Sequence, residues 1–401
     1  MMSEAYIVDA IRIPRAKAHP VKGAYASLKP VDLLKPLYDA LLERNGFASD
    51  EVDQVILGCS SQVSDQGANI AKISSLHAGW ADTVSGITLS SFCCSGLDAV
   101  NFGASKIRSG MDSILVTGGI EQLSRVHMFA DKGAWYSDPA VMQSTRFMHM
   151  GLAADLIACR AGFSRQQLDD LALQSHQRAL VATSAGFFNR SLITLKDADG
   201  KPLLAADDAI RATADETTLA ALPASFSEQL AMGQVQVDRV YAPLTLQALH
   251  SAGNAPALVD GASLVLLANA ESCRHKGWAK RAKVQFFANA SDEPVQMLTG
   301  HLRATEKLLQ RTGLKVSDID LWEVNESFAA SVLLYQRHFS IDNDKLNVNG
   351  GAIAMGHPLG ATGGNLIGML LDEMERRDLK RGIAAICGGA GLGVATLITR
   401  E

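Results

Sequence analysis

An internal repeat constrains the fold of this 401-residue chain more than any other feature of its sequence. Residues 41–58, LLERNGFASDEVDQVILG, align without gaps with residues 308–325, LLQRTGLKVSDIDLWEVN. Each copy reads as a helix end, a capping glycine, an acidic turn and a buried strand. Residues 104–119 and 374–389 form a second pair, in which a basic helix end precedes an apolar strand that stops at Gly-Gly. The sequence therefore predicts an α/β protein whose two halves share one order of elements.

The stretch between the two halves has a different sequence pattern. Short helical patterns alternate there with polar, irregular segments such as KDADGKPLLAADD at residues 196–208. Irregular surface segments of this kind are common places for ligand recognition. We therefore predict an N-terminal half at residues 1–120, an inserted loop domain at 121–248 and a C-terminal half at 249–401.

Composition and charge argue against several classes of protein. A net charge of −5 gives no basic surface, so we expect no nucleic acid partner, although helix N-termini can still bind an anionic ligand. Six cysteines without a CxxC pair argue against a disulfide scaffold and against a zinc or redox site, and we expect no metal. The longest apolar run is too short to cross a bilayer, and the acidic first residues predict no signal peptide. We expect a cytoplasmic protein without a membrane partner.

The stretch SSFCCSGLDAV, residues 90–100, places two adjacent cysteines between an apolar strand and the start of a helix. A thiol at a helix N-terminus lies near the positive end of the helix dipole, which lowers its pKa and favours the thiolate. Cys93 is therefore a candidate nucleophile. The alternative is a pair of small, buried, apolar side chains.

Three further polar groups follow predicted strands or lie in glycine-rich turns. His357 precedes Pro358 in NVNGGAIAMGHPLGATGGN, Asn325 follows the repeated strand in EVNESFAA, and Cys387 ends an apolar strand before GGAGLG. An incidental histidine and a helix cap by Asn325 are the alternatives. The final glycine run lacks the helix that a dinucleotide fingerprint requires. Two thiols, an imidazole and an amide at sheet ends favour covalent acyl chemistry with a proton transfer.

Eight blocks of sequence, spread over nearly the whole chain, resemble those of the thiolases, the acetyl-CoA acetyltransferases and 3-ketoacyl-CoA thiolases. The blocks are IVDAIRIP, CCSGLDAV, GGIEQLS, MHMG, SAGNAPALVDGA, NESFA, NVNGGAIAMGHPLGATG and CGGAGLG. The resemblance implies the thiolase fold, a duplicated five-layered αβαβα core with an inserted loop domain. It also implies an acyltransferase of fatty acid metabolism and β-oxidation, with coenzyme A and acyl-CoA as substrates, no permanently bound cofactor, and assembly as a homodimer or homotetramer.

The resemblance also implies a role for each candidate residue. Cys93 matches the nucleophile that carries the acyl thioester, His357 the group that takes its proton, and Cys387 the acid/base at the α-carbon. Asn325 matches the holder of a water that forms one oxyanion hole with His357, and the backbone N–H groups of Cys93 and Gly389 match the second hole. Residues implied to line the pantetheine and acyl tunnel are His149, Met150, Ser251, Ala252, Gly253 and Phe328.

The chain departs from the family pattern at four positions. Ser90 stands where many thiolases have asparagine, Pro256 where serine is usual, and His301 and Arg303 where two prolines are usual. These changes leave the reactive residues in place, so we hypothesise an altered acyl specificity, toward a branched, cyclic or medium-length 3-ketoacyl-CoA. Cys94 occupies a position that is usually small, and we expect it to be packed rather than reactive.

Other classes of protein with a related sequence differ in the reactive residues that they require. A decarboxylating ketosynthase would carry histidine in place of Cys387, and a non-catalytic acyl-CoA or lipid-binding relative would lose one of the three reactive groups. A biosynthetic enzyme that forms acetoacetyl-CoA is an alternative within the family. The direction of reaction, thiolysis or condensation, is open at this level because the same residues serve both.

Overall fold

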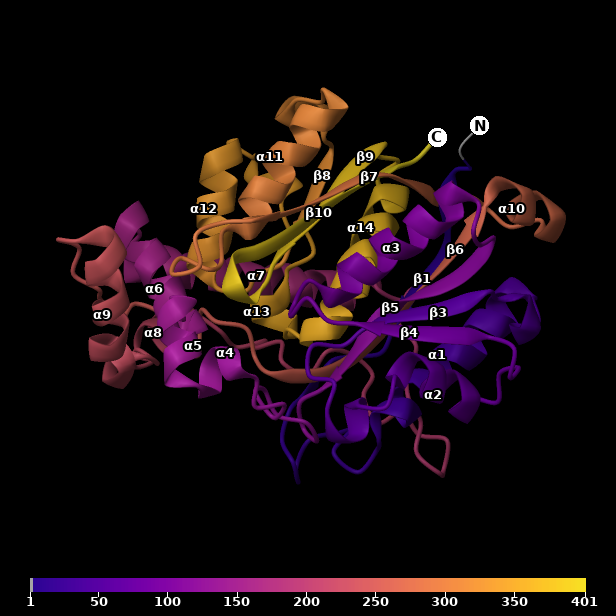
Figure 1. The fold of residues 1–401 in the computed structure, drawn as a ribbon, viewed down its shortest axis with the longest axis horizontal. Helices are drawn as coiled ribbons and strands as arrows, with labels where there is room; N and C mark the ends of the chain where they lie inside the picture. Colours follow the sequence, from indigo (N-terminus) through magenta and orange to yellow (C-terminus); the bar gives the residue numbers. More distant parts are fainter. Residues whose placement is uncertain (1–2) are drawn as a thin grey trace.

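The computed structural model describes residues 3–401, so the first two residues of the predicted N-terminal half lie outside the described part. The strands form a hydrogen-bonded path in the order β4-β3-β5-β6-β1-β7-β10-β9-β8, with β2 paired to β6 (Figure 1). The strands are β1 (Ala5–Arg12), β2 (Ala16–Lys17), β3 (Gln54–Gly58), β4 (Ser85–Leu89), β5 (Ile114–Gln122), β6 (Val259–Asn269), β7 (Ala282–Ser291), β8 (Leu321–Val324), β9 (Arg381–Cys387) and β10 (Leu392–Thr399).

Helices cover and separate the strands. They are α1 (Pro30–Asn45), α2 (Ile70–His77), α3 (Ser95–Ser109), α4 (Ala134–Ser137), α5 (Pro139–Ser144), α6 (Met150–Ala161), α7 (Arg165–Ser184), α8 (Glu216–Ala220), α9 (Leu230–Tyr241), α10 (Ala270–Lys276), α11 (Gly300–Thr312), α12 (Ala329–Phe339), α13 (Ala352–Met355) and α14 (Thr362–Arg376). No helix within residues 3–401 is long and apolar enough to span a membrane.

The path divides into two sheets that meet at a short seam. β1 and β7 pair only through Tyr6 with Lys283 and Ile7 with Ala282. The N-terminal sheet, β4-β3-β5-β6-β1, and the C-terminal sheet, β7-β10-β9-β8, each combine parallel strands with antiparallel ones. Parallel strands must be joined by crossover helices, so each sheet acquires helices on its faces.

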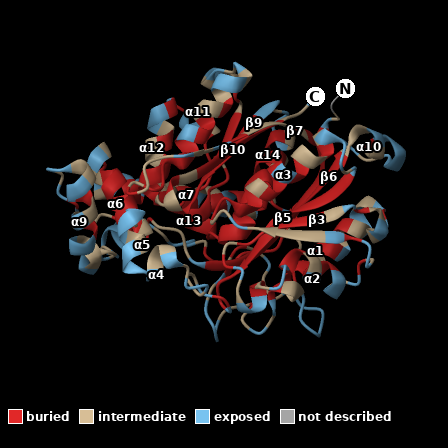
Figure 2. Cartoon of the chain, in the orientation of Figure 1, coloured by how far each residue is buried: buried red, intermediate tan, exposed pale blue. Residues whose placement is uncertain are grey.

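The layers follow the predicted αβαβα order. α1 and α2 cover the outer face of the N-terminal sheet, and α3 and α14 lie together between the sheets (Figure 1). α11 and α12 cover the C-terminal sheet, where their apolar side chains share a core with β8, β9 and β10. Figure 2 shows the strands and the central helices mostly buried, with exposed residues on the outer helices. The predicted five-layered fold is confirmed.

The internal repeat forms equivalent structure in the two halves. α1 ends at Gly46 and α11 at Gly313, both in the left-handed conformation, and a short turn and then a strand follow in each. Asp53 accepts hydrogen bonds from the first amides of β5, and Asp320, its counterpart in the repeat, accepts from those of β9. Equivalent aspartates therefore fix the start of the neighbouring strand in the two halves.

Glycines bring the central helices α3 and α14 into backbone contact. A Cβ atom on Gly96 would lie 2.3 Å from the Gly360 carbonyl oxygen, and one on Gly363 would lie 1.9 Å from the Leu97 nitrogen. Only glycine permits so close an approach. As a result, the turn that carries Cys93 and the stretch that carries His357, one from each half, lie next to each other.

The inserted segment packs on the C-terminal half. Apolar residues of α6, α7 and α9 share one core with the start of α12, with Ile353 of α13 and with Cys387. Among the strands, β6 falls within the predicted C-terminal range 249–401, yet it pairs with β5 and β1 in the N-terminal sheet. The domain boundaries remain a prediction, and we propose moving the boundary between the halves to the connection after α10.

Candidate active site

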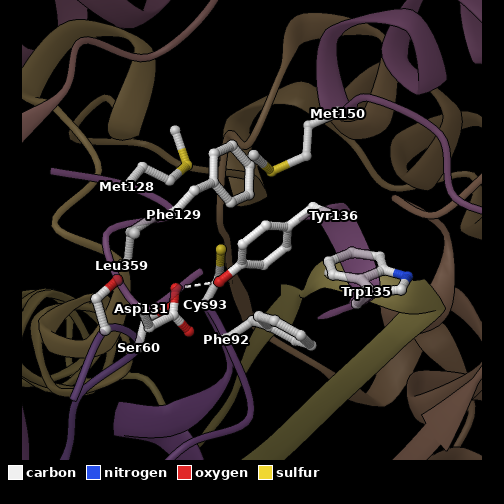
Figure 3. A pocket seen from close by; sticks show the side chains of 12 residues that line it. Ser60, Phe92, Cys93, Met128, Phe129, Asp131, Trp135, Tyr136, Met150 and Leu359 are labelled. Carbon is white, nitrogen blue, oxygen red and sulfur yellow. Dashed lines mark hydrogen bonds between the residues drawn. The ribbon is translucent and has the colours of Figure 1, made fainter. Parts of the chain in front are cut away.

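Cys93 lies in a sharp connection between β4 and α3, and it lines the pocket drawn in Figure 3. Phe92, the residue before it, has a φ of 54°, in the left-handed region that residues other than glycine rarely adopt. Ser95 holds the bend, because its hydroxyl donates to the Phe92 carbonyl oxygen at 2.5 Å and accepts from the Ser91 amide at 2.9 Å. Backbone strain of this kind is concentrated at functional sites. Here it places Cys93 on a pocket wall while leaving the residue only 9% exposed.

Burial has a larger effect on the pKa of the Cys93 thiol than the dipole of α3 does. Removal from water raises the pKa of this thiol, and the nearby Cys387 and Glu121 raise it further. The expectation that α3 lowers the pKa is therefore wrong, because a terminal dipole of about half a charge does not offset desolvation. Cys93 is a neutral thiol and needs a base before it can attack.

The pocket at Cys93 has mainly aromatic and apolar walls (Figure 3). Tyr136 projects into it and donates a hydrogen bond to Asp131. The cavity measures about 40 Å³, which is room for on the order of three waters. The lining residues are Ser60, Ser61, Phe92, Cys93, Met128, Phe129, Asp131, Trp135, Tyr136, Met150, Leu359 and Gly389.

His357 is fixed through its backbone and its ring. Gly356, with a φ of 91°, turns the chain into His357, and the His357 amide donates to the Ala257 carbonyl oxygen at 3.2 Å. Ring Nδ1 lies 2.7 Å from the Thr362 hydroxyl oxygen, whereas buried Nε2 has no hydrogen-bond partner among residues 3–401. Burial, and then the charge of Arg15, lowers the pKa of His357 to about 3. The ring is therefore neutral, and Nε2 is available for a proton.

Cys387 ends β9 inside a small polar cluster. Its sulfur lies 3.2 Å from the Ser327 oxygen and 3.9 Å from the Ser331 oxygen. Asn325 follows β8 and donates through Nδ2 to the Ser327 hydroxyl at 2.8 Å, while its Oδ1 has no partner within the described chain. Burial raises the pKa of the Cys387 thiol, whereas the hydroxyls of Ser327 and Ser331 lower it. Cys387 is thus a buried thiol whose anion two hydroxyl groups can stabilise.

Cys94 and Gly389 connect the nucleophile turn with the C-terminal half. Cys94 is fully buried and its thiol donates to the Ile386 carbonyl oxygen at 3.6 Å, so the expectation of a packed side chain is confirmed. Gly389 lines the pocket, and a Cβ atom there would lie 3.1 Å from the rings of both Phe92 and Trp135. The absence of a side chain at Gly389 leaves room for these rings.

Aromatic rings connect two of the residues expected to line the substrate tunnel. His149 caps the start of α6 and lies 5.5 Å from the Phe226 ring, which lies 6.1 Å from the Phe328 ring, centroid to centroid. Burial lowers the pKa of His149. A Cβ on Gly151 would clash with the Phe226 ring, so the MHMG block leaves space for this aromatic group. Met150 lies instead on the wall of the Cys93 pocket.

The predicted turn at residues 251–253 is held by arginines of the inserted segment. The Ser251 hydroxyl accepts from Arg165 and from the Gly253 amide, each at 3.1 Å. Arg211 donates to the Ala252 carbonyl oxygen at 2.8 Å. Ser251 and Gly253 are buried, whereas Ala252 is exposed, so only part of this turn faces solvent.

The departures from the family pattern have different environments. The exposed Ser90 makes a single 3.3 Å bond to the Ser60 carbonyl oxygen, a weak hold on the nucleophile turn. His301 is completely buried and stacks on Tyr335 with 4.9 Å between ring centroids. Arg303 lies on the surface of the same helix and pairs with acidic neighbours.

The structure brings Cys93 and Cys387 near each other at the junction of the two halves, and the stretch that follows His357 packs against the start of α3. Cys93 and Gly389 share the pocket with Met150, and Cys387 shares its hydroxyl cluster with Asn325. The tunnel candidates of the inserted segment and of the 251–253 turn lie next to each other, because residues 224 and 225 pair with residues 250 and 251. Sequence reasoning missed the hydroxyl groups that contact the reactive side chains, although one of them stands inside the quoted block NESFA. These residues are Ser327, Ser331 and Thr362.

Comparison with known proteins decides the family. The family model "Thiolase, N-terminal domain" matches residues 5–271, and "Thiolase, C-terminal domain" matches residues 278–400. The chain belongs to the thiolase family. Its members transfer acyl groups, so this thiolase is an acyltransferase.

Similar proteins match this thiolase over its whole length. Steroid 3-ketoacyl-CoA thiolase FadA6 of Mycobacterium tuberculosis is 34% identical, over 100% of this chain and 95% of that protein. A 3-ketoacyl-CoA thiolase of Serratia proteamaculans is 36% identical over 100% of both chains. The crystal structure of the Bacillus anthracis acetyl-CoA acetyltransferase has a TM-score of 0.86 at 30% identity, covering 99% of each chain. The thiolase fold is thereby confirmed.

Proposed function

We propose that this thiolase cleaves a 3-ketoacyl-CoA with free coenzyme A to acetyl-CoA and a shortened acyl-CoA, or runs the reverse Claisen condensation. The observation that carries the proposal is the proximity of two buried thiols, Cys93 and Cys387, where the stretch that carries the neutral His357 packs against the start of α3. Coenzyme A and acyl-CoA are then substrates, and no cofactor is permanently bound. All six cysteines are thiols, which fits a reducing, cytoplasmic location.

Acylation begins with proton transfer from Cys93 to Nε2 of His357. The Cys93 sulfur then forms a bond to the 3-keto carbon, and the electron pair of the keto group moves to its oxygen. Collapse of this oxyanion breaks the bond to the α-carbon and leaves the acyl group as a thioester on Cys93. In this proposal the backbone N–H groups of Cys93 and Gly389 stabilise one such oxyanion, and loss of a donor of this kind costs ~3 kcal/mol.

Cys387 completes the carbon–carbon step. Its thiol gives a proton to the departing α-carbon of acetyl-CoA and becomes a thiolate, which Ser327 and Ser331 can stabilise. In the second half-reaction the thiol of free coenzyme A returns this proton to Cys387 and attacks the thioester. The proton on His357 returns to Cys93, so both thiols regain their starting state. Condensation is the same sequence reversed.

The proposed acyl group is cyclic, branched or of medium length rather than acetyl alone. Aromatic and apolar side chains line much of the pocket at Cys93. Walls of this kind suit an apolar acyl group. The similarity to a protein named as a steroid 3-ketoacyl-CoA thiolase agrees with this proposal.

We also propose a homodimer, or a tetramer built from two dimers, that associates through β4. β4 stands at the end of the strand path, so within the described chain one of its edges pairs with no strand. The large apolar side chains of Ile73, Leu76 and Phe102 are 39–45% exposed on the helices α2 and α3, which flank this region. An open strand edge beside exposed apolar side chains favours pairing with a second copy.

Separate measurement of the two half-reactions tests the roles of the two thiols. Cys93→Ala should abolish acyl transfer and the covalent mass adduct. Cys387→Ser should still form an acyl-enzyme at Cys93 from an acyl-CoA donor, yet lose most carbon–carbon cleavage. An active Cys93→Ala enzyme, or a Cys387→Ser enzyme that no longer acylates, would contradict the division of labour.

A further inference from the structure

A histidine outside the proposed reaction reaches Cys387 through one hydroxyl group. Nε2 of His301 lies 3.5 Å from the Ser331 hydroxyl oxygen, and that oxygen lies 3.9 Å from the Cys387 sulfur. His301 is on α11, Ser331 on α12 and Cys387 at the end of β9. All three are buried, with exposures of 0%, 0% and 1%, so water does not screen their interactions.

The hydrogen bonds of Ser331 determine which groups donate and which accept in the series His301–Ser331–Cys387. A hydroxyl has one hydrogen and two acceptor sites. The hydrogen of Ser331 is donated to the Leu298 carbonyl oxygen at 3.0 Å, the shorter of its oxygen and nitrogen contacts. The oxygen of Ser331 is therefore the acceptor for His301, whose Nε2 must carry a hydrogen, and it can also accept from the Cys387 thiol.

The remaining contacts of His301 hold the ring in place but leave one of its two nitrogen atoms without a hydrogen-bond partner. The ring stacks on Tyr335 at an interplanar angle of 20°. Nδ1 has no hydrogen-bond partner among the described residues, although the ring is fully buried. Burying an unpaired ring nitrogen destabilises the protein, and the packing of Tyr335 alone does not require a nitrogen there. This cost suggests that the imidazole serves another purpose at this position.

We propose that His301 is a positioning residue that sets the proton affinity of Cys387 through Ser331. When Cys387 becomes a thiolate, the Ser331 hydrogen turns from the Leu298 carbonyl oxygen to the sulfur. Hydrogen bonds in a series polarise one another, so the His301 N–H on the Ser331 oxygen makes that hydroxyl a better donor to the thiolate. The N-terminus of α12, where Ser331 is the third residue, adds the positive end of a helix dipole on the same side. The inference rests on the proposed function, because it assigns proton exchange at the α-carbon to Cys387.

The consequence is confined to one half of the reaction. Cys387 as a thiolate removes a proton from the methyl group of acetyl-CoA, which forms the S–H bond and moves the C–H electron pair into the enolate. His301 stabilises that thiolate indirectly and has no part in acylation of Cys93. Loss of His301 should therefore slow α-proton exchange and leave acylation unchanged.

The test measures both half-reactions in His301→Phe. Phenylalanine keeps a ring that can stack on Tyr335 but has no ring nitrogen. Exchange of acetyl-CoA methyl protons with deuterated water should slow about five- to tenfold, the effect of one lost hydrogen bond, while the rate of acyl-enzyme formation stays within about twofold. His301→Gln, which places an N–H donor near the position of Nε2, should recover most of the exchange rate.

A double-mutant cycle shows whether His301 acts through Ser331. Ser331→Ala should slow exchange by itself, and adding His301→Phe to it should have no further effect. Arg303→Gln is the matched control, because Arg303 lies two residues along the same helix, 53% exposed, with acidic neighbours only. It should change neither half-reaction. If His301→Phe fails to fold, the comparison of His301→Gln with Ser331→Ala retains the test.

Three results overturn the inference. They are equal slowing of both half-reactions in His301→Phe, no slowing of exchange, or fully additive effects in the double mutant. Failure of the proposed function has a different signature. In that case the unmodified protein itself shows no acyl adduct on Cys93 and no exchange of acetyl-CoA protons.

Discussion

The reactive side chains are buried and electrically neutral before any substrate is bound. Burial raises the pKa of both thiols and lowers the pKa of His357 to about 3. Ionisation must therefore be coupled to the reaction itself, through proton transfer between neighbouring groups. The adjacent oxygen atoms on Ser327, Ser331 and Thr362 then decide how easily each proton moves.

Thr362→Val should impair catalysis far more than stability. Valine has nearly the shape of threonine but removes the hydroxyl 2.7 Å from Nδ1 of His357, which orients the ring. We expect a fall of about 100-fold in the acylation rate, the size that misplacement of a catalytic group by about 1 Å can have. Thr362→Ser should retain most of the rate. Rapid-quench measurement of acyl-enzyme formation checks this, and an unimpaired valine variant would contradict the role of the hydroxyl.

Burial of His301 predicts how stability depends on pH. Burial lowers the pKa of His301 to about 3 from 6.5, so between these values the unfolded chain binds the proton and the folded chain does not. The histidine therefore destabilises the folded state increasingly as pH falls below about 6.5, by up to ~1.4 kcal/mol per pH unit. The free-energy cost of His301→Phe should shrink by about 1 kcal/mol between pH 6.5 and 5.5 in urea unfolding, because the unfolded histidine is half protonated at pH 6.5 and other groups cancel in the difference. A constant cost would contradict the burial of a neutral ring.

At the scale of elements, the contact between α3 and α14 joins the two halves of the site. Gly363→Ala would place a methyl group 1.9 Å from the Leu97 nitrogen and force the helices apart. We expect a loss of about 3 kcal/mol or more in the free energy of unfolding, with a loss of activity because Cys93 and His357 separate.

Gly368→Ala on the same helix is the matched control. Its Cβ would meet Ala10 at 3.6 Å, an ordinary contact, and alanine is the better helix former. This variant should be as active as the parent and more stable by about 0.5–1 kcal/mol. Equal effects of the two substitutions, measured by denaturant unfolding, would show that close helix contact at Gly363 is unimportant.

The sequence predicted elements where a local pattern specifies them. The repeat predicted matching helix, turn and strand in both halves, and Asp53 and Asp320 perform the same task in each. It did not predict that β6 joins the N-terminal sheet, because strand partners depend on contacts far apart in sequence. It also predicted a lowered pKa for Cys93, because a helix dipole can be read from the sequence and desolvation cannot. The role of Ser331 depends on packing of α12 against β9, which no spacing in the sequence indicates.

At the scale of the whole molecule, the proposed dimer predicts a sensitive surface near β4. Ile73→Glu places a charge on an apolar side chain that is 45% exposed on α2. If a second copy covers this face, burying that charge should weaken self-association at least about tenfold, visible as lighter species in sedimentation. Val181→Glu, on the 63% exposed Val181 of α7, should leave assembly unchanged. Unaltered assembly of the Ile73 variant would place the interface elsewhere.

The most direct test of the account is a panel of 3-ketoacyl-CoAs incubated with the protein and free coenzyme A. Loss of the magnesium-enolate absorbance would be followed together with the intact mass of the protein. We predict cleavage of cyclic, branched or medium-length substrates in preference to acetoacetyl-CoA, with a mass increase equal to the shortened acyl group that maps to Cys93. Absence of cleavage and of any adduct on every substrate would contradict the proposed thiolase chemistry of Cys93, His357 and Cys387.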